Sequence, residues 1–224
     1  MAEQQLNLYA TYKYTDAYFG LDAAKRTSVR EKIAKTVTGL AQATHLYSVF
    51  PARCEGDFLV WSALVAEEDG VAGEFLTKYQ EQMEDLRAYA QPVESLWGFT
   101  RPSMYARGKT EQDIDPFEGD RRTYFVIYPF SKTKDWYVMS MDARQGMMNE
   151  HIKKGKEYPD VRQLLLYSFG LQDHEFVVSY EMDELVMFSK LVQELRATQG
   201  RLYTLLDTPI ITAVHRTVDQ FVRK

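Results

Sequence analysis

The chain has 224 residues, of which 45% are hydrophobic and 26% charged, so it is long enough to bury a substantial core. A net charge of −5 argues against nucleic acid as a partner, and the single cysteine, Cys54, excludes an internal disulfide and any site built from several cysteines. No apolar run approaches the roughly 20 residues that span a bilayer, and the first residues do not read as a secretory signal, so we expect a cytoplasmic protein without a membrane span.

The first half of the chain predicts strands and helices in alternation. Residues 6–12 predict a strand and residues 27–42 a helix. A hairpin follows, in which residues 46–50 pair with residues 57–62. Large apolar side chains then recur at helical spacing over residues 75–86, which predicts a second helix.

The second half of the chain repeats this order. A polar stretch over residues 106–120, with two glycines and a proline, predicts a connector. After it we expect a strand at 124–128 and a helix at 142–154. A second hairpin, 166–170 with 175–180, and a helix at 185–195 complete the repeat.

Each half therefore reads strand–helix–strand–strand–helix–strand, which is the ferredoxin-like split βαβ order. The predicted fold class is α+β, with two tandem ferredoxin-like repeats forming a dimeric α+β barrel within one chain. Closure of the barrel would pair the exposed strand edges, although repeats that stand alone are the alternative. We expect the N-terminal repeat at 1–108, the connector at 109–120 and the C-terminal repeat at 121–224.

His151 is the first candidate for chemistry. It belongs to the segment DARQGMMNEHIKKG, where Ser140 or Asp142 can cap the helix start and Gly155 can end the helix. Helical spacing places Arg144, Met147, Met148 and His151 on one face. A neutral imidazole beside two methionines suits an axial iron ligand, whereas a lone histidine is more often a hydrogen-bonded core residue. The histidines at positions 45, 174 and 215 share no metal-ligand spacing and are expected to be structural or exposed.

Two further segments contain candidate residues. In YPFSKTKDWY, Tyr128 is expected to end a strand because Pro129 cannot donate to a ladder, and Lys132 follows nearby. A strand-end tyrosine beside a lysine can deliver an electron, a proton or a hydrogen bond, but a surface turn is the common alternative. In VRQLLLY, the neighbours Arg162 and Gln163 must point to opposite faces of a strand, so only one of them faces a given pocket.

Together, in this order, these segments resemble the chlorite dismutase-like superfamily. The resemblance rests on YPFSKTKDWY, RQGMMNEH, YPDVRQ, YSFGLQDHEFVVSYE and LVQELRATQGRLY, and on the segment TRPS before the connector. It covers the C-terminal half closely and the N-terminal half at the level of architecture. The matching N-terminal helix has no histidine, so the resemblance implies one iron site per chain.

The resemblance implies a haem b or coproheme cofactor whose iron is bound axially by His151. In that family, chlorite dismutases carry a distal arginine and one large branch of the coproheme decarboxylases carries a glutamine. The position that corresponds here is Gln163, which favours the decarboxylase; a one-residue slip in register would turn Arg162 inward instead. Tyr128 would form the radical that attacks a propionate and Lys132 would orient that propionate. Trp136 and Arg196 complete the expected cofactor-binding residues. The glutamate that chlorite dismutases place near the proximal histidine has no counterpart at residues 199–201.

The expected function is peroxide-dependent decarboxylation of coproheme to haem b, with coproheme or haem and hydrogen peroxide as the small-molecule partners. Chlorite dismutation or another haem-dependent peroxidase-like activity is the alternative enzyme hypothesis. A haem-binding barrel without turnover is the alternative from another class. Relatives assemble as rings, usually pentamers, so the resemblance also implies a homo-oligomer.

Overall fold

A computed structural model describes residues 4–106, 108 and 110–223, which fold as a mixed α+β structure around one large, mainly antiparallel sheet. The strands are β1 (Gln5–Tyr14), β2 (Ala43–Ser48), β3 (Phe58–Val65), β4 (Ala90–Phe99), β5 (Tyr124–Lys132), β6 (Arg162–Tyr167), β7 (Phe176–Met182), β8 (Thr204–Leu206) and β9 (Ile211–Arg216). The helices are α1 (Asp16–Phe19), α2 (Ala23–Thr38), α3 (Val71–Glu84), α4 (Lys134–Val138), α5 (Met141–Lys156), α6 (Leu185–Arg196), the 3-10 helix η1 (Gln199–Tyr203) and α7 (Val218–Val222). None of the helices in the described ranges is long and apolar enough to cross a bilayer.

The strands of the sheet pair in the order β7-β6-β4-β1-β3-β2-β9-β5-β8, and β7 also pairs with β5. The two ends of the main run of strands are therefore joined. Two seams connect the halves of the chain: β2 pairs with β9 over three residue pairs, and β4 pairs with β6 only at Phe99 opposite Tyr167. Within the halves the ladders are longer, so most of the sheet is held by pairings between strands of the same half.

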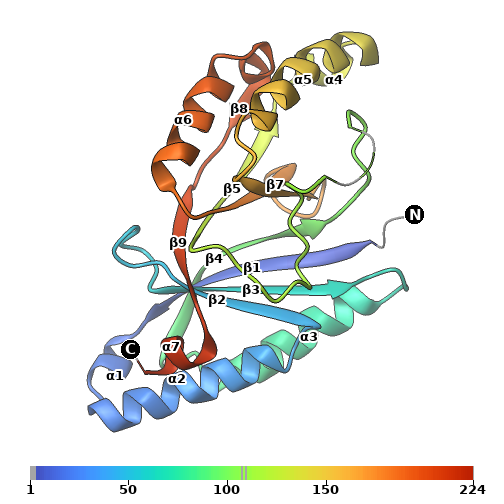
Figure 1. The fold of residues 1–224 in the computed structure, drawn as a ribbon. Coiled ribbons are helices and arrows are strands. Elements are labelled where there is room, and N and C mark those ends of the chain that lie inside the picture. Colours follow the sequence, from blue (N-terminus) through green and yellow to red (C-terminus); the bar gives the residue numbers. More distant parts are fainter. Residues whose placement is uncertain (1–3, 107, 109, 224) are drawn as a thin grey trace.

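Helices cover the sheet on two sides. Figure 1 shows α2 and α3 packed along the N-terminal strands, whereas α5 and α6 lie over the C-terminal strands at the opposite end of the molecule. Buried side chains form one cluster between the N-terminal strands and their helices, a second between the C-terminal strands and theirs, and a third on the inner face that both sets of strands share. The inner cluster is aromatic, with Trp61 stacked on Phe125 and Tyr9 tilted against both rings.

The helices α2 and α5 follow the first strand of their respective halves but differ in packing. From α2, Ile33, Ala34 and Val37 enter the core as an i, i+1, i+4 apolar stripe. No residue of α5 is fully buried. Burial of one apolar side chain contributes about 1.5–3 kcal/mol, so α5 is held to the sheet by much less apolar burial than α2.

Several predicted boundaries needed correction. The strand that contains Tyr128 does not end there: β5 continues through Pro129, which lies opposite Val177 in the ladder with β7. Pro129 is tolerated because β9 pairs with β5 only as far as Ile127, so no partner on that side needs a backbone N–H. Helix α5 also runs one residue beyond Gly155.

The helix predicted at 27–42 is α2, which begins at Ala23 because Asp22 accepts a hydrogen bond from the backbone of Lys25 and caps the start. The predicted connector at 109–120 is described from residue 110 onward. Residues 107 and 109, together with 1–3 and 224, lie outside the described residues.

Candidate functional site

His151 lies in the middle of α5, on the face that helical spacing predicts. The hydroxyl of Ser140 accepts a hydrogen bond from the backbone of the third helical residue and caps the helix start. Met147, Met148 and His151 are all half-buried. The imidazole makes no hydrogen bond within the described part of the chain. Burial lowers the pKa of His151 to about 4, with a further contribution from the positive charge of Lys132. The ring is therefore neutral at pH 7, and both its nitrogens are without a partner among the described residues.

Lys132, the last residue of β5, is a half-buried cation near this imidazole. Its Nζ donates to the carbonyl oxygen of Gly200 at 3.0 Å and to Oγ1 of Thr204 at 3.3 Å. The ammonium also sits 4.6 Å from the centre of the buried Trp136 ring. Burial, followed by the charge of Arg201, lowers the pKa of Lys132 to about 8. The residues of η1 and its flank thus hold Lys132 in a fixed position beside α5.

Tyr128 lies on β5 four residues before Lys132, and its ring packs in the cluster of side chains beneath α6. Lys132 follows an irregularity in the ladder with β8, but its ammonium lies 6.0 Å from the ring of Phe130, which belongs to the same cluster. The Tyr128 ring stacks on Tyr180 of β7 with centroids 6.0 Å apart. Burial raises the pKa of Tyr128, so its phenol is protonated at neutral pH. The charges of Asp207, Arg196 and Arg201 also reach this phenol.

Arg196 is exposed at the end of α6 and already has an acidic partner. Its Nη2 lies 3.0 Å from Oδ2 of Asp207, and Nη2 of Arg201 lies 3.2 Å from the same oxygen. One carboxylate is therefore shared by two guanidinium groups. The pair of arginines shows that this corner, next to Tyr128, can hold a carboxylate.

The alternation along β6 separates Gln163 from Arg162. Gln163 is directly opposite Tyr180 in the ladder with β7, so both side chains lie on the face that the C-terminal helices cover. Arg162 points to the other face, where it pairs with Glu118 at 2.6 Å and approaches the buried Glu181 at 3.9 Å. Gln163, and not Arg162, shares the sheet face of Tyr128.

The structure brings together most of the residues that the sequence predicts. Lys132, Trp136 and His151 lie around η1, and Tyr128 lies beside Arg196. Gln163 stands further along the same sheet face, with Tyr180 between it and β5. The sequence did not indicate three further residues that contact or electrostatically influence Tyr128, Lys132 and Arg196. They are Tyr180, Arg201 and Asp207. Strand parity in FVVSYEM was a signal for Tyr180, because it shares the face of Val178 and Phe176.

The chemistry of these side chains fits an iron porphyrin. A neutral imidazole without a partner in the described chain offers a lone pair for axial ligation. The methionines beside it and the thin packing of α5 provide an apolar surface that the protein itself leaves half-covered. Lys132 and the arginines supply cations for carboxylate groups on the ring edge.

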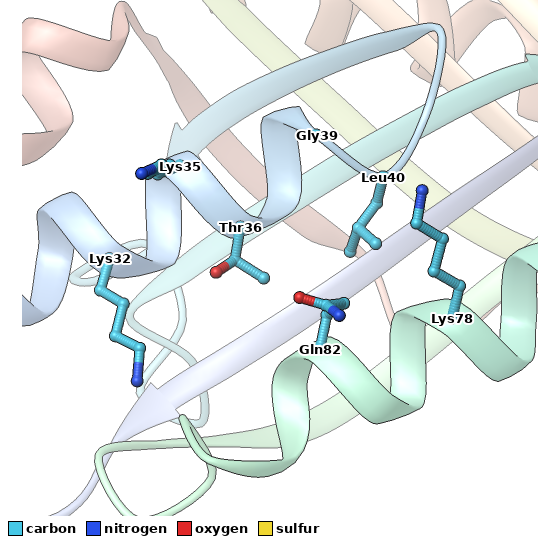
Figure 2. A pocket seen from close by; sticks show the side chains of 7 residues that line it. All are labelled: Lys32, Lys35, Thr36, Gly39, Leu40, Lys78 and Gln82. Carbon is cyan, nitrogen blue, oxygen red and sulfur yellow. The ribbon is translucent and has the colours of Figure 1, made fainter.

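The surface hollow in Figure 2 is unrelated to this group. It has a volume of about 360 Å³ and lies between α2 and α3 in the N-terminal half. Three lysines, Lys32, Lys35 and Lys78, stand at its rim. All three side chains are exposed, and the wall offers no buried polar group. Nothing in this hollow repeats the histidine, tyrosine or tryptophan of the C-terminal half.

Comparison with known proteins identifies the family of the chain. The family model described as chlorite dismutase matches residues 24–216. A coproheme decarboxylase of Mycolicibacterium smegmatis is 28% identical over 181 residues, which cover 80% of this chain and 75% of that protein. A coproheme decarboxylase of Staphylococcus carnosus is 29% identical over 124 residues, which cover 48% of this chain and 49% of that protein.

Solved structures give the same fold. A chlorite dismutase variant of Candidatus Nitrospira defluvii in complex with cyanide superposes with a TM-score of 0.84 at 19% identity, covering 100% of this chain and 95% of that chain. The imidazole complex of the same enzyme gives a TM-score of 0.82 at 17% identity, covering 99% of this chain and 95% of that chain. The family predicted from the sequence is thereby confirmed: the chain belongs to the chlorite dismutase family and, with that family, is a haem-dependent enzyme.

Proposed function

We propose that this protein is a peroxide-dependent coproheme decarboxylase that converts coproheme to haem b. The observation that carries the proposal is the neutral, unpaired imidazole of His151 on the half-covered face of α5, with the ammonium of Lys132 close by. The coproheme decarboxylases among its curated relatives support the choice of substrate.

Coproheme is the substrate and hydrogen peroxide the oxidant in this proposal. When bound, the iron porphyrin supplies the redox centre that peroxide oxidises. Each propionate that becomes a vinyl group loses carbon dioxide, two electrons and one proton, while peroxide is reduced to water. His151 binds the iron, and Lys132 and Arg196 hold propionates through charge-assisted hydrogen bonds. Tyr128 is protonated at neutral pH and acts as the redox-active side chain next to the reacting propionate, with Trp136 supporting Lys132.

The orientation of β6 favours decarboxylation over chlorite dismutation. Gln163 is on the same sheet face as Tyr128, whereas Arg162 is engaged with Glu118 on the other face. A distal arginine is the feature that the resemblance associates with chlorite chemistry. Chlorite dismutation and haem binding without turnover are the alternative outcomes that the experiment distinguishes.

The experiment is to mix the purified protein with coproheme and hydrogen peroxide and to follow the product masses. We expect successive losses of carbon dioxide from two propionates. His151→Ala should bind the porphyrin with a changed absorption spectrum, and Tyr128→Phe should bind with the wild-type spectrum but lose at least 100-fold in turnover. Coproheme that binds to the wild-type protein without any loss of carbon dioxide would contradict the proposal, and oxygen release from chlorite would support the alternative.

The proposal extends to the architecture of the chain. The strand order β4-β1-β3-β2 in the first half corresponds position by position to β9-β5-β7-β6 in the second. This supports two tandem ferredoxin-like repeats, 1–108 and 121–224, that form a dimeric α+β barrel on either side of the connector at 109–120. We also propose a cytoplasmic homo-oligomer, with a pentamer as the assembly that light scattering should detect.

A further inference from the structure

The connector between the two halves runs against the strand that contains Gln163. The backbone N–H of Gln163 donates to the carbonyl oxygen of Gln112 at 2.7 Å, and the N–H of Ile114 donates to the carbonyl oxygen of Gln163 at 2.9 Å. These two bonds form a parallel bridge between Asp113 and Gln163. Ile114 is buried in the inner aromatic cluster, which fixes the connector at this point. Both backbone polar groups of the distal residue are therefore bound by the connector.

The side chain of Gln112 extends this contact to the other side of the site. Its Nε2 lies 3.2 Å from the carbonyl oxygen of Gly155, 2.9 Å from that of Tyr158 and 3.1 Å from that of Val161. Gly155 is one helical turn beyond His151 on α5, and Val161 immediately precedes β6. One half-buried amide thus binds both ends of the turn that joins the helix of the axial ligand to the strand of the distal residue. We name this set of three contacts the Gln112 bridge.

The packing of α5 explains why such a bridge matters. No residue of this helix is fully buried, so its distance from β6 is weakly determined by apolar contacts. In contrast, the Gln112 bridge consists of directional bonds to carbonyl groups at the end of α5 and in the turn that follows it. The carbonyl groups of Gly155 and Tyr158 also accept a backbone N–H from within the turn, so the bridge ties a turn that is already hydrogen-bonded to the connector. A displacement of about 1 Å in a reacting group can cost 10²-fold in rate.

We propose that Gln112 is a positioning residue that sets the separation between His151 on α5 and Gln163 on β6. This inference rests on the proposed function, since it concerns the two residues that face the porphyrin iron from its opposite sides. Gln112 does not contact the porphyrin in this proposal. It acts through the helix end and the strand start that it binds together.

Two substitutions of similar size remove the bridge. Gln112→Glu keeps the length of the side chain but presents a carboxylate, without a donor, to three carbonyl oxygens. Gln112→Met keeps the approximate shape and removes the polarity. The matched control is Gln172→Glu: Gln172 also binds two backbone groups, the N–H of Trp97 at 2.9 Å and the carbonyl oxygen of Ser95 at 2.7 Å, but on the loop between β6 and β7.

The first measurement uses the protein without porphyrin. Amide hydrogen exchange followed by NMR should show at least tenfold faster exchange at Gln163 and Ile114 in both Gln112 variants, with unchanged exchange for the central residues of β3. The Gln172 control should leave these two amides at the wild-type rate. Wild-type exchange in both Gln112 variants, or equal acceleration in the control, would overturn the proposal.

The second measurement uses the protein loaded with coproheme. In both Gln112 variants we expect His151 ligation to persist in the absorption spectrum, cyanide affinity to fall about tenfold and kcat to fall about tenfold with KM within twofold of wild type. The inference is wrong if both variants retain wild-type cyanide affinity and kcat. Failure of the wild-type protein to decarboxylate bound coproheme counts against the proposed function alone, because exchange and cyanide affinity still test the bridge.

Discussion

At the scale of single residues, Lys132 shows how burial prepares a side chain for a ligand. Its ammonium is surrounded by an indole face, a carbonyl and a hydroxyl, with Arg201 close enough to oppose its charge. The negative charge of Glu175 acts in the opposite direction to that of Arg201, but burial has the largest effect on the ammonium. A carboxylate that enters the site therefore meets a cation that has already been desolvated, which strengthens their interaction.

This environment predicts a pH dependence of coproheme affinity. The pKa of Lys132 is lowered to about 8, so the side chain is charged below that pH and neutral above it. Affinity measured by absorption titration between pH 6.5 and 9.5 should fall as the pH rises through about 8. Lys132→Met should bind roughly tenfold more weakly at pH 7 and lose this dependence, as expected for removal of one charge-assisted hydrogen bond. Lys134→Met, two residues along, should behave like the wild type, and an identical profile in the Lys132 variant would contradict the assignment.

The placement of the candidate residues was predictable to different degrees. The helix face of His151 could be predicted because spacing along a helix is a local property of the sequence, whereas the predicted strand end at Tyr128 was wrong. The sequence could not show which residue of β6 faces the C-terminal helices, since a slip of one residue reverses both faces. In the structure Gln163 is opposite Tyr180, so Gln163 lies on the face that these helices cover. Arg201 and Asp207 were missed because their importance lies in contacts between segments that only the fold brings together.

At the scale of elements, the seam between β4 and β6 depends on a close approach of two backbones. A β-carbon added to Gly98 would lie 2.6 Å from the carbonyl oxygen of Tyr167 and 2.5 Å from the hydroxyl oxygen of Ser168. That hydroxyl in turn donates to the carbonyl oxygen of Trp97 at 2.5 Å. Only a residue without a side chain fits between these strands.

Gly98→Ala should therefore lower the free energy of unfolding by about 1–3 kcal/mol, the usual cost of overpacking. Gly73→Ala is the matched control, because a β-carbon there meets nothing within 4 Å on α3. Replacing a helical glycine by alanine should raise the stability by about 0.5–1 kcal/mol. Chemical denaturation measures the free energy of unfolding of both variants. Equal values for Gly98→Ala and Gly73→Ala would show that β4 and β6 can move apart at the seam without loss of stability.

The elements themselves were largely predictable, because apolar spacing distinguishes helices from strands in both halves. The predicted mixed α+β class and the predicted family are both confirmed. The continuation of β5 beyond Pro129 was not predictable, since it depends on where β9 stops pairing, which is decided some eighty residues later in the chain. The path of residues 110–120 beside β6 could not be predicted either, because a polar loop has no periodic pattern of apolar residues.

At the scale of the whole molecule, a buried carboxyl group on the inner face of the sheet lies beside Arg121, the first residue after the connector. Glu181 is fully buried and approaches Arg121 at 3.4 Å, while the Arg121 guanidinium lies 5.3 Å from the Trp61 ring centre. Neither carboxylate oxygen has a hydrogen bond within the described residues. Burial therefore outweighs the nearby arginines and raises the pKa of Glu181 to about 7.

The pKa of Glu181 predicts how global stability depends on pH. The folded protein binds the proton of Glu181 more tightly than the unfolded chain does. Protonated Glu181 therefore adds to the free energy of unfolding below pH about 4.5, and this addition is lost as the pH rises through about 7. The loss amounts to as much as about 3 kcal/mol. Denaturation at several pH values should give a flatter dependence for Glu181→Gln than for the wild type. The exposed Glu184→Gln should keep the wild-type slope, and an unchanged slope in the Glu181 variant would contradict the raised pKa.

The position of β9 between β2 and β5 has a consequence for synthesis of the chain. On the ribosome, β1 to β4 emerge together with their helices and can collapse first. The outer edges of β2 and β4 then have no partner until residues 162–167 and 211–216 have been translated. A product that stops before Ile211 would have an open strand edge at β2, which is a template for aggregation.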